Sequence, residues 1–327
     1  MVQVENEVGL LGNPRDACPK ANATFSEPIP GDLFKFLAAE WTNLHPDLKF
    51  HLPNIDSVEF TKRQGQNWEA AFGKGPKTDK IFMAYHYESY VNYVAEAGKP
   101  VYSLPLFTNI WMNYVGEDSD NDFPTVVGDG GLPGDYPSGG ATSNVLDIWQ
   151  RFAPNLAFIS LDVYFSNYTR TCEEYRHRGQ PLFIPEQRRD AYGARRIWVA
   201  YGSFATLGKS PISDIVLEAQ TRPDSSIGFY FDEVPDNMHD TVKPTVYRFG
   251  DFELIIERFF VFGKLGPAEG MMIHQTRGRF WLIGWGFQVQ ARALSAKANF
   301  TGILRFEEKT PEGCPSRGAA ELEDSEW

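Results

Sequence analysis

Residues 1–7, Met-Val-Gln-Val-Glu-Asn-Glu, alternate apolar and polar side chains and then end abruptly in an Asn-Glu pair. Alternation with a period of two is the pattern of a β-strand, and the polar pair would lie at its carboxyl end. Barrel enzymes place their reacting groups at that end of their strands. The segment therefore predicts a strand that presents the carboxylate of Glu7 at a site, and such a strand needs neighbours on both sides.

The pattern of strand, polar tip and helix recurs through the first two-thirds of the chain. Apolar runs predict strands at 101–107, 156–161 and 181–186. Polar or aromatic side chains stand at or just after the ends of these strands, namely Asn109, Trp111, Tyr164 and Glu186. Helical spacing of apolar residues follows or precedes each strand, as at 68–97 and 194–204. Alternating strands and helices predict a parallel α/β architecture.

After about residue 216 the chain changes to short β-rich runs that are separated by Gly, Pro and Asp. This spacing is typical of an antiparallel β-sandwich-like module. We therefore expect a catalytic α/β domain at 1–215 and a β-rich domain at 216–308. The polar tail at 309–327 predicts disorder.

The charge and composition exclude several classes of partner. The 327 residues carry a net charge of −12, which disfavours binding to nucleic acid or to an anionic membrane surface. The chain has no run of about 18 apolar residues that could span a bilayer. We expect a small neutral ligand as partner, and the composition leaves the oligomeric state open.

The sequence predicts neither a metal site nor a cofactor. The three cysteines, Cys18, Cys172 and Cys314, have no CxxC spacing. Residues 118–122 begin like a calcium loop, but Phe123 stands where such a loop needs glycine. A solvated acidic loop explains that segment better.

The compartment stays open. The Asn-x-Thr sequons at Asn22, Asn167 and Asn299 would permit glycosylation in a secretory setting, although such tripeptides also arise by chance. The chain contains no segment that resembles a signal peptide, while a longer parent protein could be secreted.

Glu7 and Glu186 stand out because each lies at the tip of a predicted strand. Hydrolysis of a glycosidic bond needs one acid to protonate the leaving oxygen and a second carboxylate to attack or to activate water. Strand tips at one mouth of a barrel can bring two such groups together. The alternative is that both are ordinary loop carboxylates, and their spacing does not decide between the two interpretations.

Residues 2–12, Val-Gln-Val-Glu-Asn-Glu-Val-Gly-Leu-Leu-Gly, closely resemble the acid/base segment of glycoside hydrolase family 35 β-galactosidases. The resemblance is to the branch that carries a C-terminal domain of unknown function, DUF5597. Residues 182–190, Leu-Phe-Ile-Pro-Glu-Gln-Arg-Arg-Asp, resemble the nucleophile segment of the same group. Segments 98–111 and 282–287 are also similar.

The resemblance implies a (β/α)₈ TIM barrel with the acid/base on the fourth strand and the nucleophile on the seventh. Glu7 is then the general acid/base and Glu186 the nucleophile. Asn6 is implied as a donor to the sugar 2-hydroxyl, a contact that strengthens in the transition state.

Three further residues are implied at the same mouth. Asn109 is expected to contact the substrate. Trp111 is either a stacking platform for the sugar or a structural tryptophan. Tyr164 either donates a hydrogen bond to Glu186 or packs as a half-buried core tyrosine.

If residues 1–7 form the fourth strand, the chain carries strands four to eight and lacks the N-terminal half of the barrel. We therefore expect a partial barrel followed by an antiparallel β-rich domain. The expected function is that of a retaining glycosidase that removes terminal β-galactosyl residues from oligo- or polysaccharides, with this chain a truncated, weakly active or inactive form. The alternative is a non-catalytic remnant that binds carbohydrate or protein.

Overall fold

A computed structural model describes residues 1–52, 55, 57–113, 131–164, 166–204, 225–232, 244–261, 264–276, 278–295, 301–307 and 319–324. The chain forms two compact units, unit 1 (Met1–Gln187) and unit 2 (Arg188–Trp327). The division falls earlier than the boundary expected near residue 215. The reason is that helix α10 (Ala191–Phe204) packs against strands of unit 2.

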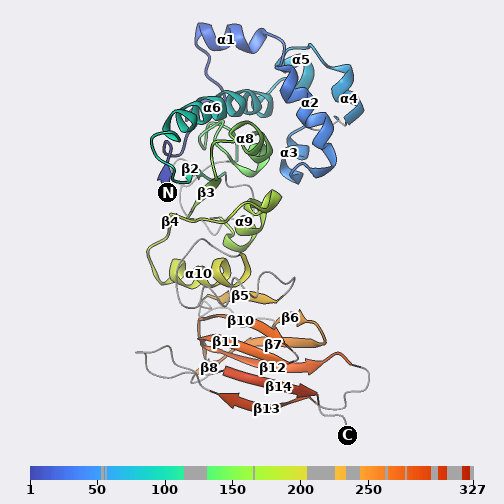
Figure 1. The fold of residues 1–327 in the computed structure, drawn as a ribbon, viewed down its shortest axis with the longest axis vertical. Coiled ribbons are helices and arrows are strands. Elements are labelled where there is room, and N and C mark those ends of the chain that lie inside the picture. The colour runs from blue at the N-terminus through green and yellow to red at the C-terminus, as the bar shows by residue number, and fades with distance from the viewer. Residues whose placement is uncertain are drawn as a thin grey trace. The chain divides into compact units, whose positions relative to one another are not determined.

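Unit 1 is built around a curled sheet with the strand order β1-β2-β3-β4 (Figure 1). The strands are β1 (Val2–Gln3), β2 (Leu106–Trp111), β3 (Phe158–Val163) and β4 (Glu186–Gln187). Each strand pairs in parallel with the next, which confirms the α/β architecture. Among the described residues, the parallel sheet consists of these four strands and is curled like half of a barrel. Within those residues it does not close into an eight-stranded barrel.

The parallel strands of unit 1 are joined by helical connections, as parallel pairing requires. The connecting elements are α1 (Pro19–Ser26), α2 (Gly31–Glu40), η1 (Trp41–Asn43), α3 (Pro46–His51), α4 (Ser57–Lys62), α5 (Trp68–Phe72), α6 (Pro76–Gly98), η3 (Ser143–Val145), α8 (Leu146–Phe152), α9 (Tyr168–Tyr175) and η4 (His177–Gly179). The stretch 68–97, expected to be helical, is broken between α5 and α6 at the Gly- and Pro-containing segment 73–76. None of the described helices is long and apolar enough to cross a membrane.

Strand β2 differs from the prediction because it begins at Leu106 rather than at Val101. Val101, Tyr102 and Leu104 are exposed, and Pro105 has no N–H to donate to a sheet. From Leu106 onward the side chains are buried.

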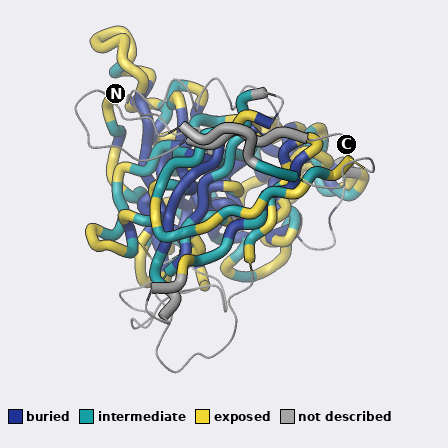
Figure 2. Tube along the Cα trace, turned by 90° about the horizontal axis from the view of Figure 1, so that it is seen from below, coloured by how far each residue is buried: buried dark blue, intermediate teal, exposed yellow. Residues whose placement is uncertain are grey.

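Strands β2 and β3 form the interior of the sheet and are buried at nearly every position. Figure 2 colours the chain by burial, with buried residues in dark blue. Strands covered on both faces read as continuous apolar runs, which explains why 156–161 predicted a strand. The rings of Phe107 and Phe158 stack across the pair, with centroids 5.3 Å apart. These two packed strands therefore hold the polar side chains near their carboxyl ends in fixed positions.

A buried ionic cluster, the Asp147 cluster, lies at the start of α8 and consists of Asp147, His45, His177 and Arg178. Asp147 Oδ2 accepts a hydrogen bond from the His45 backbone N–H at 2.7 Å. Asp147 Oδ1 lies 2.8 Å from His177 Nε2 and 2.8 Å from Arg178 Nε. Although burial favours the protonated form, these hydrogen bonds hold the pKa of Asp147 below its ordinary value of 3.8.

Unit 2 contains antiparallel sheets, as predicted for this part of the chain. Their orders are β13-β14-β11-β10-β5, β12-β7-β6 and β8-β9. The strands are β5 (Ser226–Phe231), β6 (Thr245–Phe249), β7 (Phe252–Arg258), β8 (Phe260–Val261), β9 (Lys264–Leu265), β10 (Ala268–Thr276), β11 (Arg279–Trp285), β12 (Phe287–Ala293), β13 (Thr301–Glu307) and β14 (Ala319–Asp324). The two larger sheets bury one shared core, which includes Phe229, Leu254, Ile256, Met272 and Phe280.

Strand β14 lies in the tail for which the polar composition predicts disorder. It pairs antiparallel with β13 and, at its first residues, with β11. Backbone hydrogen bonds to existing strands do not require apolar side chains, so composition alone misses such a strand. The rest of the 309–327 segment lies outside the described residues.

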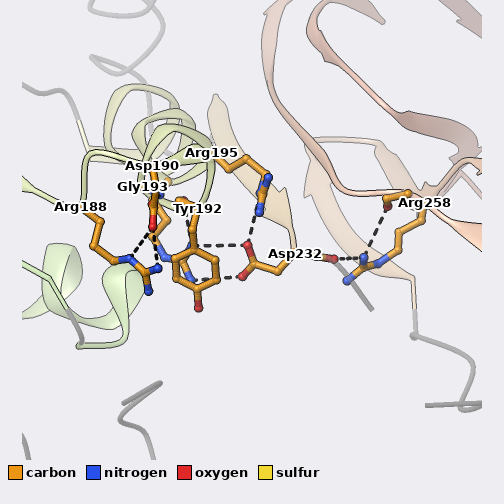
Figure 3. A network of polar contacts seen from close by, with 9 residues as sticks. Arg188, Asp190, Tyr192, Gly193, Arg195, Asp232 and Arg258 are labelled. Atoms are coloured by element: carbon orange, nitrogen blue, oxygen red, sulfur yellow. Dashed lines mark hydrogen bonds and ion pairs between the residues drawn. The ribbon is translucent and has the colours of Figure 1, made fainter. Parts of the chain in front are cut away.

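Within unit 2, helix α10 is joined to the sheet by a polar network (Figure 3). Arg195 Nε lies 3.3 Å from Asp232 Oδ1, and Arg196 Nη2 lies 3.1 Å from Asp232 Oδ2. Arg258 donates to the Asp232 backbone oxygen. At the other end of the network, Asp190 accepts from the Gly193 N–H at 2.8 Å. One carboxylate, that of Asp232, thus holds a helix to a strand end.

Candidate active site

The chain leaves β1 in a backbone conformation that residues other than glycine seldom adopt. Glu5 has a φ of 61° and Glu7 a φ of 48°, both in the left-handed region. Such conformations cost on the order of 1 kcal/mol each and persist where neighbouring contacts hold them. Gln3 Nε2 donates to the Glu5 backbone oxygen at 3.0 Å, and the Glu7 N–H donates to Asn109 Oδ1 at 2.9 Å. The turn after β1 is therefore held by side chains from β1 and β2.

Asn109 connects the strand ends. Its Oδ1 accepts from the Glu7 N–H and from Gln3 Nε2, each at 2.9 Å. Its Nδ2 donates to Asn6 Oδ1 at 3.0 Å and to Asp162 Oδ2 at 2.6 Å. Because both its donors and its acceptor are occupied by the protein, Asn109 positions its neighbours. A direct contact to substrate, which the sequence predicted, would require one of these hydrogen bonds to open.

Asn6 is placed differently, since its side chain is exposed. Its Oδ1 accepts hydrogen bonds from Gln3 and Asn109 at 3.0 Å each. These two bonds fix which end of the amide is the acceptor. The Nδ2 group is thereby oriented as a hydrogen-bond donor at the protein surface.

Three carboxyl groups gather at the carboxyl ends of the parallel strands, and we call Glu7, Asp162 and Glu186 the carboxyl cluster. Asp162 is the buried residue at the end of β3, 2% exposed, and stands opposite Glu186 in the β3–β4 register. Glu7 lies within hydrogen-bonding reach of Asp162, and the charge of Glu186 acts on the pKa of Glu7. A hydrogen bond between two carboxyl groups requires that one of them keeps its proton.

The electrostatics of the carboxyl cluster favour that shared proton. Burial, reinforced by the charge of Glu186, raises the pKa of Glu7 above its ordinary value of 4.5, although the hydrogen bond to Asp162 opposes this shift. Burial, followed by the charges of Glu186 and Glu7, raises the pKa of Asp162 to about 8. Asp162 Oδ1 is buried and has no hydrogen-bond donor in the described part of the chain. The cluster thus holds a transferable proton at neutral pH.

Glu186 is the half-buried first residue of β4 and accepts a hydrogen bond from the Tyr164 hydroxyl at 2.9 Å. A donor of this kind stabilises an ionised carboxylate. Tyr164 is 37% exposed, so it is a surface-reaching donor and not a core residue. Of the two interpretations of Tyr164 that the sequence left open, the structure places it in contact with Glu186.

Trp111 is the last residue of β2, half-buried, and stands opposite Asp162 in the β2–β3 register. Its role as stacking platform or structural residue stays a prediction. The structure thus gathers Glu7, Asn6, Asn109, Tyr164 and Glu186 at one set of strand ends, with Trp111 in register beside them.

Asp162 and Gln3 also belong to the site, although the sequence did not predict them there. Asp162 directly follows the apolar run 156–161, so its position at a strand tip was the available signal. Gln3 carried no such signal, because its role depends on the turn after β1 folding back onto Asn109.

In the described residues, no group of three or more His, Cys, Asp or Glu is arranged to hold a metal ion, and this includes the carboxyl cluster. Cys18 is exposed and Cys172 is buried, and both are free thiols. The Asp118–Asp122 loop and Cys314 lie outside the described residues. The polar groups of the site are carboxyl groups, side-chain amides and a phenol. Such a set is suited to proton transfer and to attack by a carboxylate.

Comparison with known proteins places a domain in unit 2. Residues 207–313 match a family described as a domain of unknown function, DUF5597. The matched segment includes strands β5 to β13 and none of the residues of the carboxyl cluster. No curated protein sequence matches the chain. The β-rich part of the chain thus contains the DUF5597 domain that was expected there.

Proposed function

We propose that unit 1 carries the site of a retaining glycoside hydrolase that removes terminal β-galactosyl residues from oligo- or polysaccharides. The observation that carries this proposal is the unequal treatment of two carboxyl groups at neighbouring strand ends. Burial raises the pKa of Glu7 toward the protonated form, while the Tyr164 hydroxyl donates to Glu186 at 2.9 Å. A retaining glycosidase needs this division between an acid and a nucleophile.

In the first step the Glu186 carboxylate attacks the anomeric carbon of the galactoside. The bond from that carbon to the leaving oxygen breaks as the bond to Glu186 forms, and the proton of Glu7 passes to the leaving oxygen. The products are the free leaving group and a galactosyl ester of Glu186. Asn6, with its amide oriented as a donor, would hydrogen-bond the 2-hydroxyl as charge develops on the sugar.

In the second step water attacks the same carbon and gives its proton to Glu7. The ester bond to Glu186 breaks and galactose leaves with its original anomeric configuration. Asp162 would serve as a positioning residue, because it shares a proton with Glu7 and is held by Asn109.

The choice of a β-galactoside rests on resemblance rather than on contacts. Residues 2–12 and 182–190 resemble the two catalytic segments of glycoside hydrolase family 35, and the DUF5597 domain of unit 2 fits the branch to which they point. On that interpretation β1 to β4 correspond to the fourth to seventh strands of a (β/α)₈ barrel. The order and parallel pairing of the four strands support this correspondence.

The test is to trap the covalent intermediate. A 2-deoxy-2-fluoro-β-galactoside with a dinitrophenyl leaving group slows both steps, but its good leaving group restores the first, so the ester accumulates. Peptide mass spectrometry should find the fluorogalactosyl group on Glu186. The Glu186→Gln variant should carry none, and Glu96→Gln, which changes an exposed glutamate of α6, should label like the native chain.

Labelling of a different residue, or equal labelling of Glu186→Gln, would contradict the proposed nucleophile. If the native chain neither labels nor hydrolyses an aryl β-galactoside, the non-catalytic alternative gains support. Calorimetric titration with galactose would then show whether that remnant still binds carbohydrate.

A further inference from the structure

Unit 1 contains a pocket of about 530 Å³ between α1 and α6 that the proposed mechanism does not use. Phe82, Tyr87 and Tyr90 line it from α6, and Ala21 lines it from α1. Leu10, from the segment that follows the turn after β1, forms part of its wall. The volume lies within the range of about 300–1,000 Å³ that is usual for small-molecule sites.

One hydrogen bond and one short stretch of backbone connect the pocket to the segment that carries Glu7. Tyr90 lines the pocket, and its hydroxyl donates to Glu5 Oε1 at 2.6 Å. Leu10 follows Glu7 by only three residues, and three residues span at most about 11 Å even when fully extended. The backbone of Leu10, which forms part of the pocket wall, therefore lies within about 11 Å of the Glu7 backbone.

The walls of the pocket suit an apolar ring better than a polyhydroxylated one. Phe82, Tyr87 and Tyr90 contribute aromatic faces, and Met83 adds a polarisable thioether. His86 also lines the pocket, and burial lowers its pKa, which keeps the imidazole uncharged at neutral pH. The charged lining residues, Asp16 and Lys20, are exposed. A second sugar would bring several hydroxyls that each need a partner, whereas an aromatic ring needs only surface contact.

The chemistry of the site sets which part of a substrate lies on this side. A general acid must reach the oxygen that leaves, so the leaving group extends from the sugar on the side of Glu7. The segment from Glu5 to Leu10 connects that acid to the pocket. We propose that this pocket binds the leaving group of the β-galactoside and that the preferred substrates carry an aromatic leaving group. This inference rests on the proposed function.

The test compares two sulfur-linked galactosides that are not hydrolysed, methyl 1-thio-β-galactoside and 4-nitrophenyl 1-thio-β-galactoside, by isothermal titration calorimetry. The nitrophenyl compound should bind the native chain at least about tenfold more tightly, because its ring buries apolar surface that the methyl group lacks. The Ala21→Trp variant fills the pocket from α1 and should remove this preference while binding of the methyl compound stays the same.

The matched control is Ala23→Trp, which adds the same side chain to an exposed position of the same helix outside the pocket. It should keep the full preference for the nitrophenyl compound. Thr24→Phe fills the pocket with a smaller ring and makes the same test if Ala21→Trp does not fold, as judged by circular dichroism.

The outcomes distinguish failure of the pocket assignment from failure of the glycosidase proposal. Equal binding of both compounds by the native chain, or an unchanged preference in the filled variants, would overturn the pocket assignment and leave the glycosidase proposal standing. Binding of neither compound would overturn the proposed function, and the assignment of the pocket with it. Tighter binding of the nitrophenyl compound that only the filled variants lose would support both.

Discussion

Two clusters of unit 1 each bury an aspartate, and they shift the pKa of that aspartate in opposite directions. In the Asp147 cluster, a fully buried aspartate meets an imidazole, a guanidinium and a backbone N–H, and its pKa is lowered. In the carboxyl cluster, an aspartate that is 2% exposed meets two further carboxyl groups, and its pKa is raised to about 8. Burial is common to both, so the partners decide the sign. Neutralising partners favour the ionised aspartate, whereas neighbouring carboxyl groups favour the protonated one.

The largest expected effect is on kcat, which a substitution in the carboxyl cluster should lower and one in the Asp147 cluster should not. Glu186→Gln removes the proposed nucleophile and should lower kcat for an aryl β-galactoside by about 10³-fold or more. Arg178→Gln, which alters the Asp147 cluster, should leave kcat within about threefold of the native value. Nitrophenol release under saturating substrate measures both. A Glu186→Gln chain with more than a tenth of native kcat would remove Glu186 from the mechanism.

The next effect separates the clusters by stability. Asp147→Ala leaves His177, Arg178 and the His45 N–H without their shared buried acceptor, and should cost about 3 kcal/mol of unfolding free energy. Glu96→Ala removes an exposed carboxylate of α6 and should cost less than about 0.5 kcal/mol. Urea denaturation followed by tryptophan fluorescence gives both values. Equal losses for the two variants would show that the Asp147 cluster is not a stabilising centre.

The pH dependence of stability should differ in sign between the clusters. Folded Asp162 keeps its proton up to about pH 8, whereas the unfolded chain releases it near pH 3.8, so unfolding free energy falls as pH rises through this interval. Asp162→Asn should remove most of that decline, which is on the order of a few kcal/mol. Asp147 acts in the opposite sense, since its lowered pKa contributes stability that is lost as pH falls below about 3.8.

Denaturation of the native and variant chains at pH 3 to 8.5 would measure these slopes. Asp147→Ala should flatten only the acidic part of the profile, and Asp162→Asn only the part between pH 4 and 8. Parallel profiles for native and Asp162→Asn chains would mean that Asp162 is ionised at neutral pH and that the cluster holds no extra proton.

The smallest effect concerns the hydrogen bond to the proposed nucleophile, Glu186. Tyr164→Phe removes the donor to Glu186, and the loss of about 1 kcal/mol should lower kcat/KM by about fivefold. Tyr168→Phe is the matched change, since the Tyr168 hydroxyl donates to Gln187, the neighbouring residue on β4. It should leave kcat/KM within about twofold. A larger effect at Tyr168 than at Tyr164 would shift the centre of the site along β4.

Much of the architecture was predictable because it depends on local patterns. The buried run at 156–161 marked β3, the Gly- and Pro-rich break at 73–76 separated two helices, and the short apolar runs after residue 216 predicted antiparallel strands. Strand β14 was missed because it pairs through its backbone. The place of α10 in unit 2 depends on packing against β5 and β10, which no local pattern records.

By itself the sequence determined which polar side chains come with apolar runs, since alternation and apolar runs single out Glu7, Asn109 and Glu186 whatever the later packing. The tertiary structure decided what those side chains meet. Curling of the parallel sheet brings Asp162 between Glu7 and Glu186, and the left-handed turn after β1 sets Glu7 against Asn109. Charge–charge interactions depend on distance and burial rather than on separation along the chain, so the stored proton exists only in the folded protein.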